Sequence, residues 1–485
     1  MEGRSRQKSV KVNAVLNVIK QLFSVIFPMI SFPYATRILG VTNYGKYTFS
    51  VSIVNYISYI AAAGILRYAV RECARIRDDK KKLNSLVNEI YTINITTTII
   101  AYVILFGLVA FVPMLKEYSL WIMIISLSVI FTTLGTDWVN SAFEDYFYIT
   151  IRYIFSQAMA VLLLFILVRE NDDIAQYALV SVFGGILANI LNIVHIRKKL
   201  GIFPKLSYSR ELIKHIKPIL YLFVCTIATF IYINSDVTVL RIFADDTSVG
   251  YYGVSTQFYQ LVKQLINAAF IVVIPRISNE LASDESKAFA RYNKILIITI
   301  LLLIPCSIGL FMIRKNLVLL FSGIEYVQAA SSLAILAIAL IPAMMANFYI
   351  NIVMIPLKLE KQVMIATVTS AMINIVLNFI LIPIYAENAA AFTTLIAEIS
   401  MTVIAVLYCR NIKMVGLVKP IVSGLVGGAI IVCICWFLNH IINNPFINVV
   451  LCVVLCVISY SAVMLLFYRS EVLSMVKTVL KRSKS

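Results

Sequence analysis

Residues 446–468 read FINVVLCVVLCVISYSAVMLLFY, a run of 23 residues without a charged side chain. A bilayer core of about 30 Å needs roughly 20 apolar residues of helix to cross it, so this run predicts a membrane-spanning helix. Runs of the same kind recur along the whole chain of 485 residues. Their apolarity is continuous, whereas a transmembrane β-barrel would show alternating segments of about ten residues. We therefore expect an all-α integral membrane protein.

The composition excludes a soluble enzyme. Hydrophobic residues make up 61% of the chain and charged residues 14%, whereas soluble domains average roughly 45–50% and about 25%. The 42 basic residues outnumber the 24 acidic ones, but they are scattered over short segments and form no single patch that would bind nucleic acid. Three distant histidines, and eight cysteines in or beside apolar segments, indicate neither a metal site nor a disulfide framework.

Charged residues, glycines and prolines divide the chain into fourteen apolar segments, each of which predicts a helix. The expected helices span residues 12–35, 47–65, 88–111, 119–138, 147–168, 174–196, 218–242, 250–274, 294–313, 328–354, 363–385, 390–409, 419–440 and 446–468. No connection between them exceeds about two dozen residues, which is too short for an extramembrane domain with its own core. We therefore expect the function to reside within the bilayer.

The distribution of Lys and Arg predicts the orientation in the membrane. If the N-terminus is cytoplasmic, the inner helix ends carry 33 basic residues and the outer ends carry seven. Lys20 and Lys263 fall inside helices and complete the total of 42. Because cytoplasmic segments of membrane proteins are enriched in Lys and Arg, we expect a multi-pass protein with both termini in the cytoplasm.

One sequence pattern occurs twice. Residues 37–50 read RILGVTNYGKYTFS and residues 241–255 read RIFADDTSVGYYGVS. In each copy an Arg-Ile pair ends one expected helix and a Gly-x-Tyr begins the next, about 204 residues apart. Six helices separate the copies, and an even number preserves orientation, so the pattern predicts two parallel six-helix lobes, as in many transporters. A shared preference for Gly and Tyr at interfacial helix starts is the alternative explanation.

The repeat predicts how the chain divides. We expect an N-lobe of six helices over residues 1–200 and a C-lobe of six helices over residues 201–415. Residues 416–485 then hold two appended helices and a cytoplasmic tail. Pseudo-symmetric lobes of this kind enclose a central cavity near the membrane midplane in many transporters.

Two expected helices, the first and the eighth, carry polar side chains along one face, because residues three or four apart in a helix share a side. These residues are Asn17, Lys20, Gln21, Gln260, Lys263 and Gln264. A charge at the helix centre costs about 2.5–3.5 kcal/mol on insertion scales, so a lysine there usually faces water or a partner. We predict a hydrated, cationic cleft for an anionic, hydroxyl-rich ligand. Its inner mouth would be lined by Arg67, Arg71 and Arg276.

Each part of this cleft has a structural alternative. Lys20 is near enough to the inner surface for its ammonium group to reach the headgroups while its stem stays in the apolar layer. The amide side chains can link helices through hydrogen bonds. The three arginines can serve as ordinary anchors at the cytoplasmic surface.

A second group of polar residues lies nearer the outer surface, roughly 8–16 Å deep at 1.5 Å of rise per residue. Its members are Asp236, Asn374, Asn378, Thr394 and Glu398. Oxygen ligands suit a hard cation such as Na⁺, and a buried carboxylate can instead carry a proton. The group predicts a binding site for a coupling ion, and we expect no other cofactor. Interhelical hydrogen bonds around a protonated Glu398 are the alternative.

Several stretches resemble, in the same order and at similar spacing, the Wzx-type polysaccharide flippases of the multidrug, oligosaccharidyl-lipid and polysaccharide (MOP) exporter superfamily. They include YATRILGVTNYGKYTFS at 34–50, GILRYAVRECAR at 64–75, DWVNSAFEDYFYITIR at 137–152 and NIVLNFILIPIYAENAAAF at 374–392. One departure is visible after the eleventh helix, where the family usually has Gly-x-x-Gly-Ala and this chain has Ala386 and Ala389. The departure concerns how tightly the outer turn can close.

The resemblance implies two lobes in a V that alternate between inward-open and outward-open states. It implies a substrate in which an O-antigen or capsule repeat unit is linked to undecaprenyl pyrophosphate and is moved from the inner to the outer leaflet of the bacterial cytoplasmic membrane. In the related lipid II flippases a sodium site draws on the seventh, eleventh and twelfth helices, and the residues here that resemble its ligands are Asp236, Asn374, Asn378 and Thr394. Asn378 replaces an expected carboxylate. The implied partners are the lipid-linked oligosaccharide, membrane lipids, a polysaccharide polymerase and a chain-length regulator.

Two other functions compete with a flippase. A multidrug or cation antiporter of the same superfamily should have an acidic or apolar cavity, and Lys20 and Lys263 argue against it. An integral-membrane polymerase or transferase should carry a sizeable outer loop, which this chain lacks. We therefore expect a transporter and no enzymatic activity.

Overall fold

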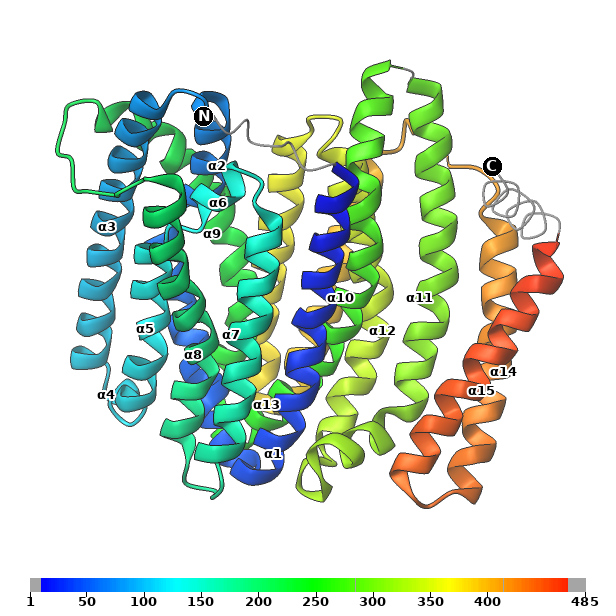
Figure 1. The fold of residues 1–485 in the computed structure, drawn as a ribbon. Coiled ribbons are helices and arrows are strands. Elements are labelled where there is room, and N and C mark those ends of the chain that lie inside the picture. The colour runs from blue at the N-terminus through cyan, green and yellow to red at the C-terminus, as the bar shows by residue number, and fades with distance from the viewer. Residues whose placement is uncertain (1–9, 284, 413, 470–485) are drawn as a thin grey trace. The chain divides into compact units, whose positions relative to one another are not determined.

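The computed structural model describes residues 10–283, 285–412 and 414–469, and the regular structure of this part is helical throughout (Figure 1). The long helices are α1 (Val10–Ala62), α3 (Lys80–Phe111), α5 (Ser119–Gly135), α7 (Tyr146–Leu167), α8 (Ile174–His195), α9 (Leu212–Phe243), α10 (Asp246–Ser283), α11 (Glu285–Ser322), α12 (Ala329–Asn347), α13 (Glu360–Tyr408), α14 (Val418–Ile441) and α15 (Pro445–Phe467). Shorter elements are α2 (Ile65–Ile76), α4 (Pro113–Lys116), α6 (Trp138–Ala142), η1 (Ile196–Leu200), η2 (Ile324–Tyr326) and η3 (Phe348–Met354). Nine helical stretches of the described chain have the length and apolarity to cross a membrane.

The fourteen predicted segments all lie on these helices, and α1 and α13 each contain two of them. Both long helices break at one residue with non-helical backbone angles. In α1 the break is Gly40, at φ 69° and ψ 174°. In α13 it is Ala386, at φ 46° and ψ −127°. A positive φ costs glycine little because it has no Cβ, whereas alanine is strained there.

The segment after α1 differs from the sequence-based expectation. The expected helices 47–65 and 88–111 leave residues 66–87 as a connection, but α2 begins at Ile65 and forms a separate amphipathic helix. It buries Ile65, Tyr68 and Cys73 in an apolar cluster with α3, α6, η1 and α9. Its three basic residues, Arg67, Arg71 and Arg75, are exposed.

A buried chain of polar groups fastens α2 to its neighbours. The Tyr68 hydroxyl lies 2.6 Å from Nδ1 of His215 in α9, and His215 Nε2 lies 2.8 Å from Oε2 of Glu89 in α3. Ser85 donates a further hydrogen bond of 3.0 Å to Oε1 of Glu89. These contacts satisfy groups that would otherwise be costly to bury. His215 therefore has a structural role in joining three helices.

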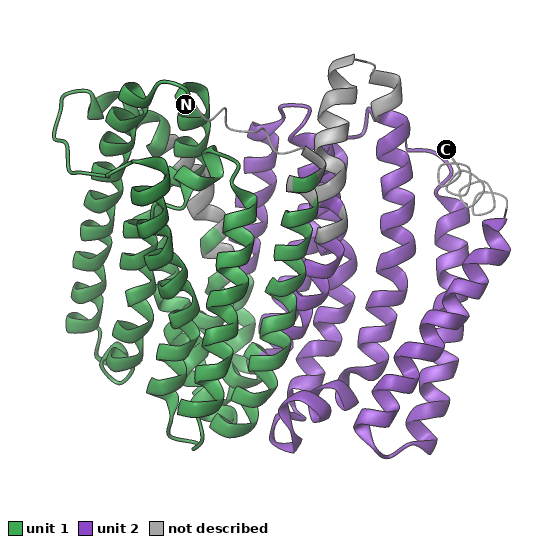
Figure 2. Cartoon of the chain, in the orientation of Figure 1, with its two compact units in different colours: residues 1–253, 375–386 green, residues 254–374, 387–485 purple. Residues whose placement is uncertain are grey.

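The chain forms two compact units, which Figure 2 shows in different colours. Unit 1 comprises residues 1–253 and 375–386, and unit 2 comprises residues 254–374 and 387–485. In unit 1, α8 packs against α5 and α7, and α1 packs against α3, α7 and α9. In unit 2, α11, α14 and α15 share an apolar cluster around Cys435. The predicted lobes, residues 1–200 and 201–415, remain a prediction.

The two copies of the repeated pattern contact each other within unit 1. A Cβ atom on Gly45 would lie 1.8 Å from the backbone oxygen of Asp246. A Cβ atom on Gly250 would lie 2.3 Å from the backbone oxygen of Val41. Any side chain at either position would therefore collide with the backbone of the other copy. Close packing explains why each copy has a glycine at this point.

The contact is locally symmetric. The hydroxyl oxygens of Thr42 and Thr247 lie 3.0 Å apart. These residues are 205 positions apart, and so are Gly45 and Gly250. Each copy therefore presents the same positions to the other, as a local two-fold relation requires.

Gly45→Ala tests the packing role of this glycine. We expect the free energy of unfolding to fall by about 1–3 kcal/mol, the usual cost of overpacking, because the neighbouring backbone atom cannot move aside as a flexible side chain would. The measurement is thermal unfolding of the purified full chain in detergent. Gly107→Ala is the matched control, because a Cβ there meets no atom within 4 Å, and it should be neutral or gain up to about 1 kcal/mol. Equal stability of the two variants would refute the close contact.

Ala386→Gly is expected to stabilise the protein by about 1 kcal/mol, because it relieves the strained φ of 46°. It would also restore the glycine that the resembling family has at this turn. Ala389→Gly is the control, since Ala389 is buried in the helical part of α13 and glycine costs about 1 kcal/mol in a helix. The same unfolding measurement applies, and a loss of stability in Ala386→Gly would contradict the strained geometry.

Candidate substrate and coupling sites

An ion pair joins Lys263 of α10 and Glu398 of α13 within unit 2. Lys263 Nζ lies 3.3 Å from Oε1 of Glu398 and 4.8 Å from the centre of the Tyr259 ring. The Tyr259 hydroxyl donates a hydrogen bond of 3.3 Å to the same carboxylate oxygen. Glu398 is only 5% exposed. The carboxylate and the ring face together offset the cost of holding an ammonium group among apolar helices.

The sequence analysis did not predict that these two side chains meet, and their predicted roles remain predictions. Lys263 was predicted to bind substrate and Glu398 to bind a coupling ion, in separate sites. Their depths already made a meeting feasible: Lys263 is roughly 16 Å from the inner surface and Glu398 roughly 8–16 Å from the outer one, in a core of about 30 Å. What the sequence does not specify is which faces of α10 and α13 meet.

A second buried cluster surrounds Asp236 of α9 in unit 1. Asn378 Nδ2 donates a hydrogen bond of 2.6 Å to its Oδ1, and the Tyr252 hydroxyl donates one of 2.7 Å to its Oδ2. The structure thus brings together two residues predicted for ion coupling that are 142 positions apart. Tyr252 was not predicted here, although it is the tyrosine of the repeated Gly-x-Tyr. Carboxylate and amide oxygens of this kind suit a hard cation, and the buried carboxylate also suits a proton.

Two other predicted coupling residues, Asn374 and Thr394, are buried in unit 2. The Thr394 hydroxyl donates a hydrogen bond of 2.9 Å to the carbonyl oxygen of Ala390. Their expected place beside Asp236 remains a prediction. Among the described residues, no group of three His, Cys, Asp or Glu side chains forms a metal site.

Lys20 of α1 is half-buried in unit 1. Its Nζ lies 5.8 Å from the centre of the Tyr153 ring of α7. Asp137 and Arg152 are both within electrostatic range of this ammonium group. Lys20 thus belongs to a charged cluster on α1, α7 and the turn after α5.

Arg152 of α7 is the residue of this cluster that the sequence analysis missed. Its Nη2 donates a hydrogen bond of 2.7 Å to Oδ1 of Asp137, and its guanidinium carbon lies 5.5 Å from the centre of the Tyr148 ring. The side chain is 7% exposed, and its Nε and Nη1 have no hydrogen-bond partner among the described residues. A buried guanidinium with two unused donors is suited to bind an anion. Its position five residues inside the predicted helix 147–168 was the available signal, but it was interpreted as a topology marker.

The remaining predicted substrate residues lie on three helices: Asn17 and Gln21 on α1, Gln260 and Gln264 on α10, and Arg67 and Arg71 on α2. Asn17, Gln21 and Gln264 are half-buried, and Gln260, Arg67 and Arg71 are exposed. Arg71 pairs with Glu72 at 2.9 Å. The side chain of Arg276 lies outside the described part of the structure. Lys20 is in unit 1 and Lys263 in unit 2, so their shared cleft remains a prediction.

Comparisons with known proteins identify the family. A family model described as "Polysaccharide biosynthesis protein" matches residues 10–281, which is more than half of the chain. The chain belongs to this family. A relative from Escherichia coli (strain K12), named "Putative O-antigen transporter", is 22% identical over 409 residues, covering 84% of this chain and 98% of the relative. A relative of the same name from Shigella dysenteriae is 24% identical over 321 residues, covering 65% and 79%.

Solved structures with a similar fold are membrane transporters. A structure of the lipid II flippase MurJ in an inward closed conformation matches with a TM-score of 0.75 at 17% identity, covering 94% of this chain and 100% of that one. An inward-facing multidrug resistance MATE family transporter of the MOP superfamily matches with a TM-score of 0.67 at 10% identity, covering 82% and 97%. The predicted fold class is confirmed: the described part of the chain is all-α, has nine helical stretches able to cross a membrane, and shares the fold of these transporters.

Proposed function

We propose that this protein flips an undecaprenyl-pyrophosphate-linked oligosaccharide repeat unit from the inner to the outer leaflet of the bacterial cytoplasmic membrane. It would do so by alternating access, driven by a coupling ion, as a step in the synthesis of a surface polysaccharide. Both termini would lie in the cytoplasm, and a polymerase and a chain-length regulator would act on the exported unit. Family membership and the names of the two relatives support the substrate class.

The observation that carries the proposal is the set of cationic groups on otherwise apolar helices. Lys20 and Arg152 lie together in unit 1, and Lys263 is held by Glu398 in unit 2. Ionised phosphates cannot cross hydrocarbon unaided, because burying one bare charge costs tens of kcal/mol in a low-dielectric medium. Cationic side chains in the path lower this cost, while the lipid tail never needs to leave the membrane.

The Lys263–Glu398 pair supports a specific form of coupling. While Glu398 is ionised it holds Lys263 at 3.3 Å and competes with the pyrophosphate for the ammonium group. The charge of Glu398 therefore affects how strongly Lys263 can bind the pyrophosphate. An ion can shift the equilibrium between the inward-open and outward-open conformations only as far as its affinities for the two differ. The Asp236 cluster supplies a second carboxylate where Na⁺ or a proton would have such an effect.

A deletion strain tests the function. Loss of the gene should abolish surface polysaccharide, and lipid-linked repeat units should accumulate in the inner leaflet, because synthesis continues while translocation stops. A plasmid copy of the full chain should restore the polysaccharide. Polysaccharide that persists with altered chain length would instead identify a polymerase. Increased resistance to cationic drugs on overexpression, without any effect on polysaccharide, would identify a multidrug exporter.

A further inference from the structure

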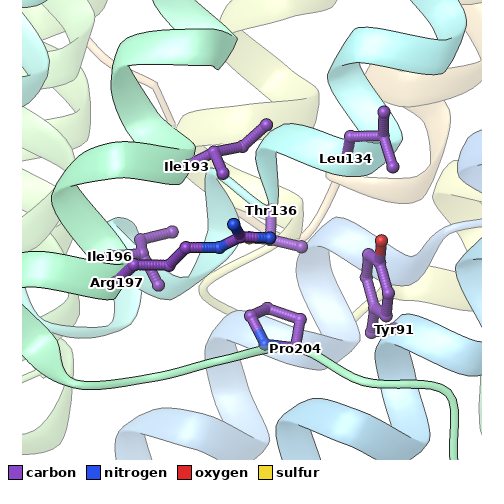
Figure 3. A pocket seen from close by; sticks show the side chains of 7 residues that line it. All are labelled: Tyr91, Leu134, Thr136, Ile193, Ile196, Arg197 and Pro204. Carbon is purple, nitrogen blue, oxygen red and sulfur yellow. The ribbon is translucent and has the colours of Figure 1, made fainter.

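A small cavity lies in unit 1. It measures about 140 Å³ and sits between α3, the end of α5, the end of α8 with η1, and the segment that follows η1 (Figure 3). Its lining residues are Tyr91, Leu134, Thr136, Ile193, Ile196, Arg197 and Pro204. None of the residues predicted for substrate binding or ion coupling lines it. The cavity is therefore a candidate site that the residues proposed for transport do not form.

The cavity combines apolar walls with one positive charge. Leu134, Ile193, Ile196 and Pro204 supply apolar surface. Arg197 and Thr136 also line the cavity, and Figure 3 labels all of these side chains. Arg197 makes no hydrogen bond or ion pair with any residue that the structure describes. Its donors are thus available to a ligand, and a guanidinium is well matched to a phosphate group.

The size of the cavity restricts what can enter. It is roughly ten times the volume that holds one water molecule, but smaller than the 300–1,000 Å³ or so of pockets that bind drug-sized ligands. An oligosaccharide repeat unit does not fit. One small anionic group, attached to something that can remain outside, does.

The location favours a lipid as the source of that group. Arg197 is the second residue of η1, which directly follows the apolar helix α8, and Lys198 and Lys199 come next. The cavity therefore lies at the end of a membrane-spanning helix, at the depth of phospholipid headgroups. Basic pockets between transmembrane helices at this depth bind anionic lipid headgroups in other membrane proteins. The apolar walls also suit the glycerol and upper acyl chain that a phospholipid brings with its phosphate.

We propose that this cavity binds the phosphate of an anionic phospholipid, with Arg197 as its principal ligand. The lipid would bridge α3, α5 and η1 and would tie down the segment around Pro204. A ligand that binds only the folded protein raises its stability in proportion to the logarithm of ligand concentration over Kd. Anionic lipid should therefore stabilise this transporter, whatever substrate it carries.

The test is thermal unfolding of the purified full chain in detergent, with added phosphatidylglycerol, with phosphatidylcholine of the same acyl chains, or with inorganic phosphate alone. Phosphatidylglycerol should raise the Tm of the wild type and the other two additives should not. Arg197→Gln should weaken the apparent affinity for phosphatidylglycerol at least tenfold, whereas Lys198→Gln, an exposed neighbour that does not line the cavity, should keep it. Ile193→Trp, which fills the cavity but keeps the charge, should also abolish the shift.

Four outcomes would overturn the proposal. An unchanged effect of phosphatidylglycerol on the Tm of Arg197→Gln would show that Arg197 does not bind the lipid. Equal loss in the Arg197 and Lys198 variants would indicate diffuse attraction to a basic surface. An equal shift with phosphatidylcholine would show that the charge is irrelevant. A full shift with inorganic phosphate alone would identify a site for free anions and not for lipid.

Discussion

Replacing Lys263 by Met is expected to abolish surface polysaccharide in a deletion strain that carries the variant gene. The substitution removes the ammonium group proposed to bind the pyrophosphate, and it leaves Glu398 buried without its partner at 3.3 Å. The second effect is itself costly, because breaking a buried ion pair by removing one side typically destabilises a protein by about 3–5 kcal/mol. A loss of polysaccharide in this variant alone therefore has two explanations.

The double variant Lys263→Met/Glu398→Gln separates them. It removes both charges, so no unpaired carboxylate remains and the protein should reach the membrane in wild-type amounts. Transport should stay absent, since the cation is still missing. Membrane abundance by immunoblot and surface polysaccharide by labelling are the two measurements. Normal polysaccharide in the double variant would show that the pair is a structural link and has no role in transport.

Cross-linking the two copies of the repeated pattern is expected to stop transport completely and reversibly. The variant is Thr42→Cys/Thr247→Cys, at positions whose hydroxyl oxygens lie 3.0 Å apart, which is close enough for a disulfide. Alternating access requires segments that close one side of the path to separate during the cycle. A disulfide here should hold them together after oxidation, and reduction should release them.

The single variants Thr42→Cys and Thr247→Cys serve as controls for the native cysteines and for the substitutions themselves. Both should transport normally in oxidising and reducing conditions. The extent of cross-linking is measured on the same samples by gel mobility after thiol blocking. Fully cross-linked protein that still exports polysaccharide would show that this contact stays closed throughout the cycle.

Much of this fold is predictable because membrane spans depend on local composition. The uncharged run at 446–468 and its equivalents are apolar over the length of a bilayer, and each lies on a helix. The amphipathic helix α2 was missed for the opposite reason: Arg67, Arg71 and Arg75 dominate its composition, while its buried face depends on Ile65, Tyr68 and Cys73 meeting other helices. Such a helix is specified by its neighbours more than by its own sequence.

The candidate functional residues also divide into those that local sequence predicts and those that depend on contacts between helices. The sequence predicts that Lys20 and Lys263 lie inside the membrane, because the depth of a residue along a helix follows from the rise per residue alone. The ion pair between Lys263 and Glu398 could not be predicted, because it depends on how α10 and α13 are rotated about their axes. Arg152 was overlooked because a basic residue near a helix end is usually a topology signal, and only its burial distinguishes it. The role of Gly45 and Gly250 likewise became clear only from the contact between the two copies.

The central claim is that cationic side chains within the membrane recognise a pyrophosphate. Its most direct test is the binding of one oligosaccharide linked to undecaprenyl through either a diphosphate or a monophosphate, measured on the purified full chain. The account predicts that the wild type prefers the diphosphate and that Lys20→Met/Arg152→Met loses at least tenfold of that preference, about 1.4 kcal/mol, while the exposed Lys198→Met keeps it. Wild-type preference retained in the Lys20/Arg152 double variant would contradict the account.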